Sequence, residues 1–480
     1  MKFRLSLVLL LVIGLFSQAN AALPPEIKEK IYNVLRDPAL ENSRVGIRVE
    51  VLGTRKEVFS YNPRIPLIPA SNLKILTTSC ALLTLGPEYH FTTTLLGNPI
   101  QNGHLQGNLV LRGSGDPTWS KDFYPDPTTP LVTLARKLKE SGLQTVDGDL
   151  VVDDSTFGRE FTGEGWKVRY QWEEYAAEIA ALSLNKNEVK VTVVPGGHVG
   201  APTQVSFWPK NHLLQVINHS FTSGHGSALS YSRNRLKNQI VLSGPLSIYN
   251  RGISFPFNVH APPLLVGSAF LETLKSHGIE VKGRVRTIRD DEIGKDLKLQ
   301  TLMQVNSPPL LSIVHRLNKE SDNFLAEHVF RTLGATDFGK GTIRNSAKAV
   351  TNCLDEFGLK ESPVVLADGS GLSDQNRVSP QTLVSVLQAM AGSPLGESFR
   401  ATLPQACQDG TLDERLCGVS AQAKTGAIRG VNSLSGYVVT NSGQTLVFSI
   451  ILNRYSCSSE CGRQLIDTII RALAQSEEAL

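Results

Sequence analysis

Hydrophobic and polar positions follow two different periods in the first part of the chain. Residues 44–52 and 58–61 alternate between apolar and polar side chains, as half-buried strands do, and a Gly-Thr turn lies between them. From Asn72 to Leu85 apolar residues recur at helical spacing, and Gly86-Pro87 ends the run. The pattern predicts a strand hairpin followed by a helix.

The middle of the chain has a different texture from both ends. From about residue 91 to residue 289, short apolar runs alternate with Gly, Pro and Asn, which is typical of strands and turns. The elements predicted after it are helices at 310–333 (with a polar break at 318–322) and 381–390, strands ending at 424, at 434–439 and up to 452, and a helix from 463. This order predicts an α+β fold interrupted by a β-rich insertion.

The first 21 residues have the features of a secretory signal. Lys2 and Arg4 precede an apolar stretch from Leu5 to Phe16, and Ala19-Asn20-Ala21 forms a cleavage site. We therefore expect a mature protein in the periplasm or cell envelope. The apolar stretch is too short for a comfortable membrane span, and no later run suits one, so we expect no transmembrane anchor. Peripheral contact with a membrane and the oligomeric state stay open.

Composition places the mature chain among ordinary globular proteins. Of its 480 residues, 41% are hydrophobic and 19% are charged, which fits two or three domains with a large core. The formal net charge of +4 includes two positive charges of the leader. The mature chain is therefore nearly neutral and gives no argument for a nucleic-acid partner.

Export also makes disulfides favourable for the six cysteines. Cys407 and Cys417 flank an Asp-Gly turn, so we predict a local bridge between them. Cys457 and Cys461 are close enough in sequence to pair as well. Cys80 falls in an apolar helical run, where we expect a buried free thiol.

Two common hydrolase chemistries lack their sequence signatures. The His residues are scattered without an H-E-x-x-H motif, and no G-x-S-x-G elbow occurs. We therefore predict no metal site, and the serine acyl-transfer chemistry considered next needs no organic cofactor.

A serine–lysine chemistry is the remaining candidate, and each of its motifs is weak alone. S-x-x-K occurs twice, at Ser71-Lys74 and at Ser183-Lys186. Ser321-Asp322-Asn323 fills the polar break between two predicted helices, and Lys424-Thr425-Gly426 occurs once, beside paired strands. S-x-x-K, S-D-N and K-T-G in this order are the signature of penicillin-binding proteins and β-lactamases.

Plainer interpretations exist for the same residues. A Ser before a helix is most often a simple N-cap, which is the alternative for Ser71. The second S-x-x-K, at Ser183, lies in the β-rich region, where we expect it to be structural. Asp368-Gly369-Ser370-Gly371 is a turn by composition. It could line the cleft, but we prefer to interpret it as a turn alone.

The whole chain after the leader resembles the low-molecular-mass class C penicillin-binding proteins, the penicillin-binding protein 4 family of D-alanyl-D-alanine carboxypeptidase/endopeptidases. The segments that carry the resemblance are "PASNLKIL", "LVLRGSGDPT", "DGDLVVDDSTF", "LSLNKNEVKVTVVPG", "NKESDNFLAEHVFRTLG", "ADGSGLS" and "AKTGAIRGVNSLSGYV". The long gap between Lys74 and Ser321 is a further similarity, since β-lactamases have no room for such an insertion. One departure is Ala427, where the family often has Thr.

The resemblance implies a fold and a division of the chain. It implies a serine β-lactamase and penicillin-binding transpeptidase-like fold, an antiparallel sheet flanked by helices. We expect residues 22–93 and 299–480 to form this part and residues 94–298 to form the β-rich insertion, with a nested subdomain near 117–185.

The resemblance also implies roles for the motif residues. Ser71 would be the nucleophile, Lys74 its base, and Ser321 a proton relay to the leaving amine. Asn323 would hold Lys74 and the substrate amide. The cation Lys424 and the Thr425 hydroxyl, next to Gly426, would bind the terminal carboxylate, and the N–H groups of Ser71 and Ala427 would form the oxyanion hole.

The implied function is a penicillin-sensitive D-alanyl-D-alanine carboxypeptidase and endopeptidase. Its implied partners are peptidoglycan stem peptides and β-lactam antibiotics. The rival functions are a β-lactamase or esterase on the same fold and a non-catalytic protein that binds the cell wall. Rapid deacylation of penicillin would distinguish the first rival, and binding without turnover the second.

Overall fold

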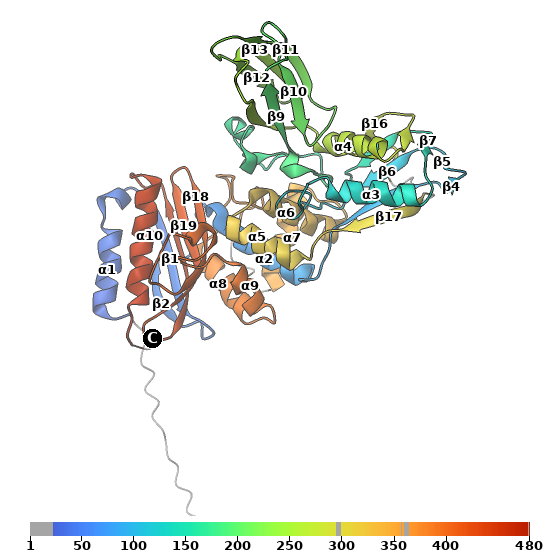
Figure 1. Ribbon diagram of the computed structural model, residues 1–480. Helices are drawn as coiled ribbons and strands as arrows, with labels where there is room; N and C mark the ends of the chain where they lie inside the picture. The colour runs from blue at the N-terminus through green and yellow to red at the C-terminus, as the bar shows by residue number, and fades with distance from the viewer. Residues whose placement is uncertain (1–22, 294–298, 357, 360–363, 479) are drawn as a thin grey trace, which may run out of the picture.

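A computed structural model describes residues 23–293, 299–356, 358–359, 364–478 and 480. The predicted signal, residues 1–21, lies outside the described residues. No helix in the described part of the chain is long and apolar enough to cross a membrane. Figure 1 shows a main body of one sheet and its helices, from which a second, β-rich part projects.

The sheet of the main body has five strands in the order β18-β19-β20-β1-β2, and every neighbouring pair is antiparallel. These strands are β1 (Arg44–Val51), β2 (Glu57–Tyr61), β18 (Ala421–Ile428), β19 (Val431–Val439) and β20 (Thr445–Asn453). Residues far apart in sequence thus lie side by side, because β1 pairs with β20 along its whole length. The central strands are buried on both faces, which matches their long apolar runs.

Helices cover both faces of this sheet. The helices of the main body are α1 (Pro25–Leu35), α2 (Leu73–Thr84), α5 (Leu310–Glu320), α6 (Asn323–Phe338), α7 (Ile343–Glu356), α8 (Pro380–Ala391), α9 (Gly396–Thr402) and α10 (Ser459–Ala474). α1 and α10 pack together on one face. On the other face α8 packs directly against the sheet, and the larger group of helices lies with it (Figure 1). The apolar side chains of each group form a separate core against the sheet.

A stem of two antiparallel strands joins the main body to the inserted region. β3 (Thr92–Gly97) pairs with β17 (Gln300–Asn306), so the chain leaves and returns at one place. We call the chain between these strands the inserted region. The division of the chain at residues 94 and 298 stays a prediction.

In its described residues, the inserted region is built from several small sheets, two α-helices and short 3-10 turns. Its sheets have the strand orders β16-β8-β6-β3-β17, β15-β7-β5-β4, β10-β9-β14 and β11-β13-β12. Its remaining elements are β4 (Ile100–Gln101), β5 (His104–Leu105), β6 (Leu109–Arg112), α3 (Thr129–Glu140), β7 (Thr145–Val146), β8 (Leu150–Asp153), β9 (Glu188–Val194), β10 (Gln204–Trp208), β11 (Gln215–Ser223), β12 (Ser230–Asn234), β13 (Gln239–Ser247), β14 (Ile253–Asn258), α4 (Pro262–Ser276), β15 (Glu280–Val281) and β16 (Val285–Thr287). The predicted nested subdomain near 117–185 contains β7 and β8, whose sheets extend outside that range. The two three-stranded sheets instead come from residues 188–258.

Three disulfides are present, and one corrects an expectation. Cys80 is not a free thiol but is bonded to Cys353, which joins α2 to α7 across the helical core. Nothing local signals this bridge, since the two residues are 273 positions apart. Cys407 is bonded to Cys417.

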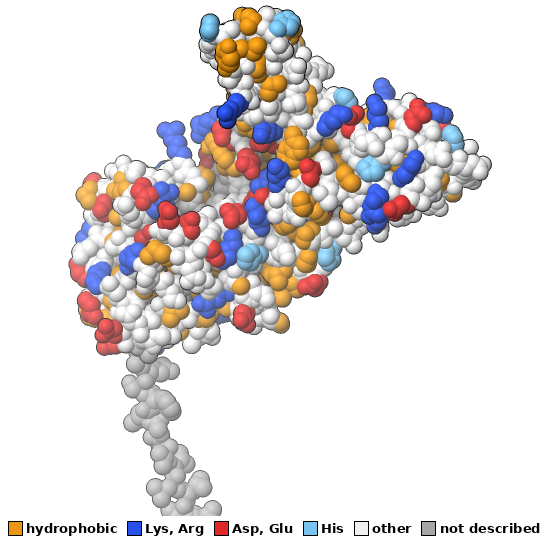
Figure 2. All heavy atoms as spheres, in the orientation of Figure 1, with side chains coloured by type: hydrophobic (Ala, Val, Ile, Leu, Met, Phe, Trp, Pro, Cys, Tyr) orange, Lys and Arg blue, Asp and Glu red, His pale blue; other side chains and the backbone are white. Residues whose placement is uncertain are grey.

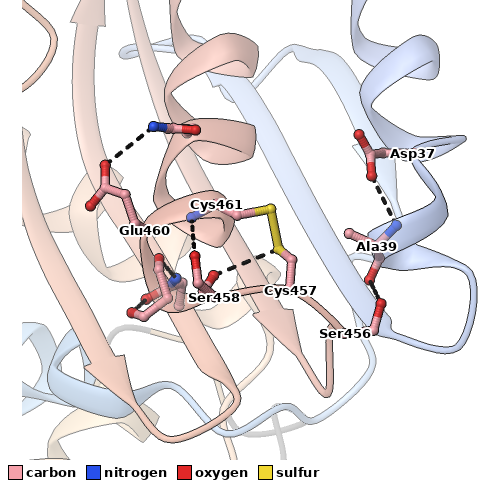
Figure 3. The surroundings of a disulfide bond; sticks show 10 residues. Asp37, Ala39, Ser456, Cys457, Ser458, Glu460 and Cys461 are labelled. Atoms are coloured by element: carbon pink, nitrogen blue, oxygen red, sulfur yellow. Dashed lines mark hydrogen bonds between the residues drawn. A yellow bond between two sulfur atoms is a disulfide. The ribbon is translucent and has the colours of Figure 1, made fainter.

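The third bridge, Cys457–Cys461, fixes the start of α10 (Figure 3). The Ser458 side chain accepts a hydrogen bond from the Cys461 N–H and so caps this helix. Next to it, the Ser456 N–H donates to the Ala39 carbonyl, which ties the segment before α10 to the chain after α1. The closing helix is therefore anchored at its first turn.

Candidate active site

The segment around Ser71 is held tightly against strand β18. Residues 70–72 form one turn of 3-10 helix before α2, and Ala70, immediately before Ser71, has a left-handed φ of 47°. The Ser433 hydroxyl donates to the Pro69 carbonyl at 2.6 Å, and Asn72 Nδ2 donates to the Lys424 carbonyl at 2.8 Å. One hydrogen bond therefore joins this segment to the K-T-G strand β18, through Asn72, and the other joins it to the neighbouring strand β19, through Ser433.

Gly426 permits this close approach. A side-chain carbon at Gly426 would lie 2.3 Å from Ser433 Oγ and 3.0 Å from the Ser71 nitrogen. Any larger residue would therefore push the Ser71 segment away from β18.

The Ser71 side chain does not cap the helix. The N-cap of α2 is Asn72, and neither the 3-10 turn nor α2 has a side-chain cap hydrogen bond. Ser71 Oγ instead lies 2.9 Å from Lys74 Nζ, one turn along the chain. The N-cap alternative for Ser71 is therefore wrong.

Lys74 is fully buried, and three oxygen atoms surround its amine. Its Nζ lies 2.9 Å from Ser71 Oγ, 2.7 Å from Asn323 Oδ1 and 2.7 Å from the Ser370 carbonyl oxygen. Amide and backbone carbonyl oxygens can only accept hydrogen bonds, so they use two N–H groups of the amine. When the amine is neutral, its lone pair is left to accept the proton of the Ser71 hydroxyl.

Burial allows the Lys74 amine to lose its proton near physiological pH. It lowers the pKa of Lys74 to about 8, although the negative charges of Asp368, Asp322 and Glu327 work against this shift. Lys424 is a second fully buried lysine, and burial, followed by the charge of Lys74, holds its pKa well below the usual value. Lys74 can therefore act as a proton acceptor where an exposed lysine could not.

The predicted site residues divide into a cleft wall and a buried layer behind it. Ser71, Ser321, Thr425, Gly426 and Ala427 all line one cleft of about 490 Å³. Lys74 and Lys424 lie behind this wall with no exposed surface.

The position of Lys424 changes its expected role. Its Nζ donates to the carbonyl of Thr425 at 3.1 Å, and the Thr425 side chain, not the ammonium, faces the cleft. Thr425 is therefore the better placed of the two to touch a substrate carboxylate.

The Ser321-Asp322-Asn323 turn is a sharp break between two helices. α5 ends at Glu320, Ser321 has a left-handed φ of 57°, and the Asp322 side chain caps α6 by accepting from the Leu325 N–H. The break is therefore narrower than the range 318–322 expected from the sequence. Asn323 directs Oδ1 to Lys74 and donates from Nδ2 to the carbonyl of Tyr175 in the inserted region at 3.0 Å.

The Asp368–Gly371 loop is part of the site, although the preferred sequence interpretation was a turn alone. It is a turn, but its Ser370 carbonyl is one of the three oxygens around Lys74. At Gly371 (φ 84°), a side-chain carbon would lie 1.9 Å from the Ala70 carbonyl oxygen, so the loop packs directly against the segment that carries Ser71. The "ADGSGLS" segment carried this signal, because Gly369 and Gly371, on either side of Ser370, permit a close backbone approach.

Glu327 on α6 holds this loop in place. It is fully buried, and its Oε1 accepts from the N–H groups of Gly369 at 3.0 Å and Ser370 at 2.8 Å. Burial, and then the neighbouring charge of Asp368, raises the pKa of Glu327 to about 7. Trp166 of the inserted region also donates to Asp368 Oδ2 at 2.9 Å.

The loop closed by Cys407–Cys417 contacts both the K-T-G strand and the end of α5, just before Ser321. Thr411 Oγ1 lies 2.6 Å from Thr425 Oγ1 on the K-T-G strand. Asp409 forms an ion pair at 2.6 Å with Lys319, two residues before Ser321.

Among the described residues no group of three or more His, Cys, Asp or Glu side chains is arranged to bind a metal.

Comparisons with known proteins agree with this geometry. The model of the D-Ala-D-Ala carboxypeptidase 3 (S13) family matches residues 27–476. A D-alanyl-D-alanine carboxypeptidase of Actinomadura sp. (strain R39) is 32% identical over 459 residues, covering 92% of this chain and 83% of the relative.

Solved structures give the same result. The crystal structure of penicillin binding protein 4 (dacB) from Haemophilus influenzae is similar with a TM-score of 0.76 and 26% identity, covering 92% of this chain and 98% of that chain. The same protein complexed with a novel β-lactam is similar with a TM-score of 0.72 and 25% identity over 92% of this chain and 98% of that chain. The predicted transpeptidase-like α+β fold is therefore confirmed.

Proposed function

This chain belongs to the D-Ala-D-Ala carboxypeptidase 3 (S13) family and is a serine-type D-Ala-D-Ala carboxypeptidase, and we propose that it acts through an acyl-enzyme on Ser71. The observation that carries the proposal is the environment of Lys74. Two of its three oxygen neighbours can only accept hydrogen bonds, so a neutral amine presents its lone pair to the Ser71 hydroxyl.

The reaction is an acyl transfer in two halves. Ser71 Oγ attacks the carbonyl carbon between the two D-Ala residues and passes its proton to Lys74. The N–H groups of Ser71 and Ala427 stabilise the resulting oxyanion. The carbon–nitrogen bond then breaks, the leaving amine takes the proton by way of Ser321, and water hydrolyses the ester on Ser71.

Substrate recognition belongs to the opposite wall of the cleft. The Thr425 hydroxyl faces the cleft and can donate to the terminal carboxylate, while Lys424 adds positive charge from behind it. The same chemistry on a D-Ala–diamino-acid cross-link of peptidoglycan makes the protein an endopeptidase. A β-lactam ring carbonyl would acylate Ser71 in the same way, as the β-lactam complex of the Haemophilus influenzae protein supports.

The place of action follows from the substrate. Peptidoglycan lies outside the cytoplasmic membrane, and residues 1–21 have the sequence of a secretory signal. We infer that the mature enzyme works in the periplasm or cell envelope.

Purified cross-linked muropeptides provide the direct test. We expect the protein to release D-Ala from pentapeptide stems and to separate cross-linked dimers, with both activities lost after penicillin treatment. Binding of muropeptides without any product would contradict the proposal. Rapid turnover of penicillin itself would instead favour a β-lactamase.

A further inference from the structure

The second S-x-x-K motif ends beside the catalytic centre, although it lies in the inserted region. The Lys186 Nζ lies 2.9 Å from Asp322 Oδ2, in the turn between α5 and α6. It also lies 2.9 Å from Asp122 Oδ2 and 3.0 Å from Glu174 Oε1, both in the inserted region. Figure 2 shows charged side chains of both signs where the inserted region meets the main body.

An unusual backbone presents Lys186 to these carboxylates. Three consecutive residues other than glycine, Asn185, Lys186 and Asn187, have left-handed φ values of 51°, 52° and 57°. Left-handed residues normally occur singly, because the Cβ atom crowds the following carbonyl. Such strained segments persist only where surrounding contacts fix them, and they concentrate at functional sites.

Hydrogen bonds from both asparagines hold the strained turn. The Asn187 side chain accepts from the Leu184 N–H at 3.1 Å and donates to the Glu178 carbonyl at 2.7 Å. Asn185 Nδ2 donates to the Glu188 carbonyl at 2.9 Å. The backbone from which the Lys186 side chain extends is therefore held by hydrogen bonds within the inserted region.

The carboxylate that Lys186 meets in the main body is close to the base. Asp322 lies between Ser321 and Asn323, and Asn323 Oδ1 contacts Lys74. Burial has the largest effect on the pKa of Lys74 and lowers it. The negative charges of Asp368, Asp322 and Glu327 have smaller effects and raise it. A cation paired with Asp322 therefore offsets one of the charges that would keep Lys74 protonated.

Lys186 remains positively charged in this setting. Burial opposes its charge, but Asp322, Asp122 and Glu174 outweigh burial and raise its pKa. Asp122 also pairs with Arg316 of α5 at 2.6 Å, and Glu188 is the further acidic group near Lys186. The cluster thus joins α5, the catalytic turn and the inserted region.

We propose that Lys186 is a positioning residue of the peptidase reaction, through which the inserted region holds the Ser321–Asn323 turn and offsets the charge of Asp322 beside Lys74. The proposal rests on the proposed function of Lys74 as the base. It gives the inserted region a part in catalysis, in addition to any contact that it makes with substrate.

The pH dependence of acylation separates this role from simple structural support. In Lys186→Met, Asp322 is left without its cation, so Lys74 holds its proton to higher pH. We expect the acidic limb of the penicillin acylation rate to move up by about half a pH unit or more, with roughly a threefold or larger loss of rate at pH 7. Asp322→Asn keeps an oxygen to cap α6 but removes the negative charge, so it should move the acidic limb of the acylation rate to lower pH.

A double variant and two controls complete the experiment. Lys186→Met/Asp322→Asn should return the limb towards its wild-type position, because both opposite charges are gone. Lys186→Arg should keep the wild-type limb. Lys282→Met, which removes an ion pair to Asp147 elsewhere in the inserted region, should change nothing.

The outcomes distinguish this inference from the proposed function. If wild-type protein is not acylated at Ser71, the proposed function fails. If it is acylated, but Lys186→Met keeps the wild-type limb or slows acylation equally at every pH, only the role of Lys186 is overturned. Should Lys186→Met not fold, the downward shift in Asp322→Asn and the wild-type limb in Lys186→Arg are the deciding measurements, and failure of either overturns it.

Discussion

The two S-x-x-K segments have the same spacing and opposite electrostatics. Lys74 is fully buried among three uncharged oxygens, and burial lowers its pKa to about 8. Lys186 is surrounded by three carboxylates, and its pKa is raised although burial opposes its charge. One lysine is thus prepared to lose a proton and the other to keep it.

The two serines differ as clearly. Ser71 lines the cleft, and within the described residues the only hydrogen-bond partner of its hydroxyl is Lys74. Ser183 is buried, and its hydroxyl bonds to the Ala180 carbonyl, to His328 Nε2 and to Asn187 Nδ2. The spacing of a motif therefore selects candidates, while burial and neighbouring charge decide which one can react.

Covalent labelling tests this difference with the largest expected effect. We expect penicillin to leave a penicilloyl adduct on the peptide that contains Ser71. Ser71→Ala should lose the adduct and at least about a thousandfold of the carboxypeptidase activity, because the nucleophile is gone. Mass spectrometry of the digested adduct locates the label.

Ser183→Ala is the matched control for labelling. It should keep the adduct on Ser71, even if the loss of buried hydrogen bonds lowers stability. A label on Ser183, or labelling that survives Ser71→Ala, would overturn the assignment of the site.

Replacing the base should have the next largest effect. Lys74→Met should slow acylation by about 10²- to 10⁴-fold, the usual contribution of a general base. Lys74→Arg should not restore it, since a guanidinium keeps its proton. In the wild type, the acylation rate should rise with pH to a midpoint near 8 as Lys74 becomes neutral. A rate independent of pH between 6 and 9 would contradict Lys74 as the base.

Lys424→Ala should have a smaller and selective effect. If Lys424 supplies positive charge for the terminal carboxylate, its loss should slow hydrolysis of D-Ala-D-Ala peptides far more than hydrolysis of a substrate without that carboxylate. Thr425→Val, which removes the hydroxyl in the cleft, is the companion variant and should show the same selectivity. Equal losses on both substrates would assign Lys424 to the general electrostatics of Lys74 or to folding.

The sequence was informative wherever a local pattern decided the structure. The helix after Ser71, the break at Ser321 and the strands around Lys424 all follow from periodicity and turn residues. Family resemblance supplied the order of the motifs and hence the fold. The Cys407–Cys417 bridge closes a short loop and could be expected from spacing and export.

Contacts between distant segments could not be predicted in this way. The Cys80–Cys353 bridge joins two apolar helices, and nothing in either helix indicates the partner. In the sequence, Glu327 cannot be told from a surface glutamate on a helix. Its role depends on the N–H groups of Gly369 and Ser370, which the fold places beside it. Lys186 looked like a chance motif because its function depends on Asp322, which is remote in sequence.

The pH dependence of protein stability should also distinguish Lys74 from Lys186, and this is the smallest of the four effects predicted here. The folded-state pKa of Lys74, about 8, lies below its unfolded value of 10.5, so the unfolded chain binds more protons between these values. Stability from this group therefore rises with pH over that window, by up to about 3 kcal/mol at 1.36 kcal/mol per pKa unit. The pKa of Lys186 is shifted upward, so its contribution is fully present below 10.5 and is lost only as pH rises through its folded-state value.

Denaturant midpoints at pH 8, 9 and 10, with the disulfides intact, measure the difference. Lys74→Met should flatten the rise in stability between pH 8 and 10 relative to the wild type. Lys186→Met should lower stability at each of these pH values and flatten the rise much less than Lys74→Met does, because it moves the pKa of Lys74 by only about half a unit. Lys282→Met should keep the wild-type slope. Parallel slopes in wild type and Lys74→Met would mean that Lys74 has an ordinary pKa in the folded protein, and the contrast between the two motifs would then lose its physical basis.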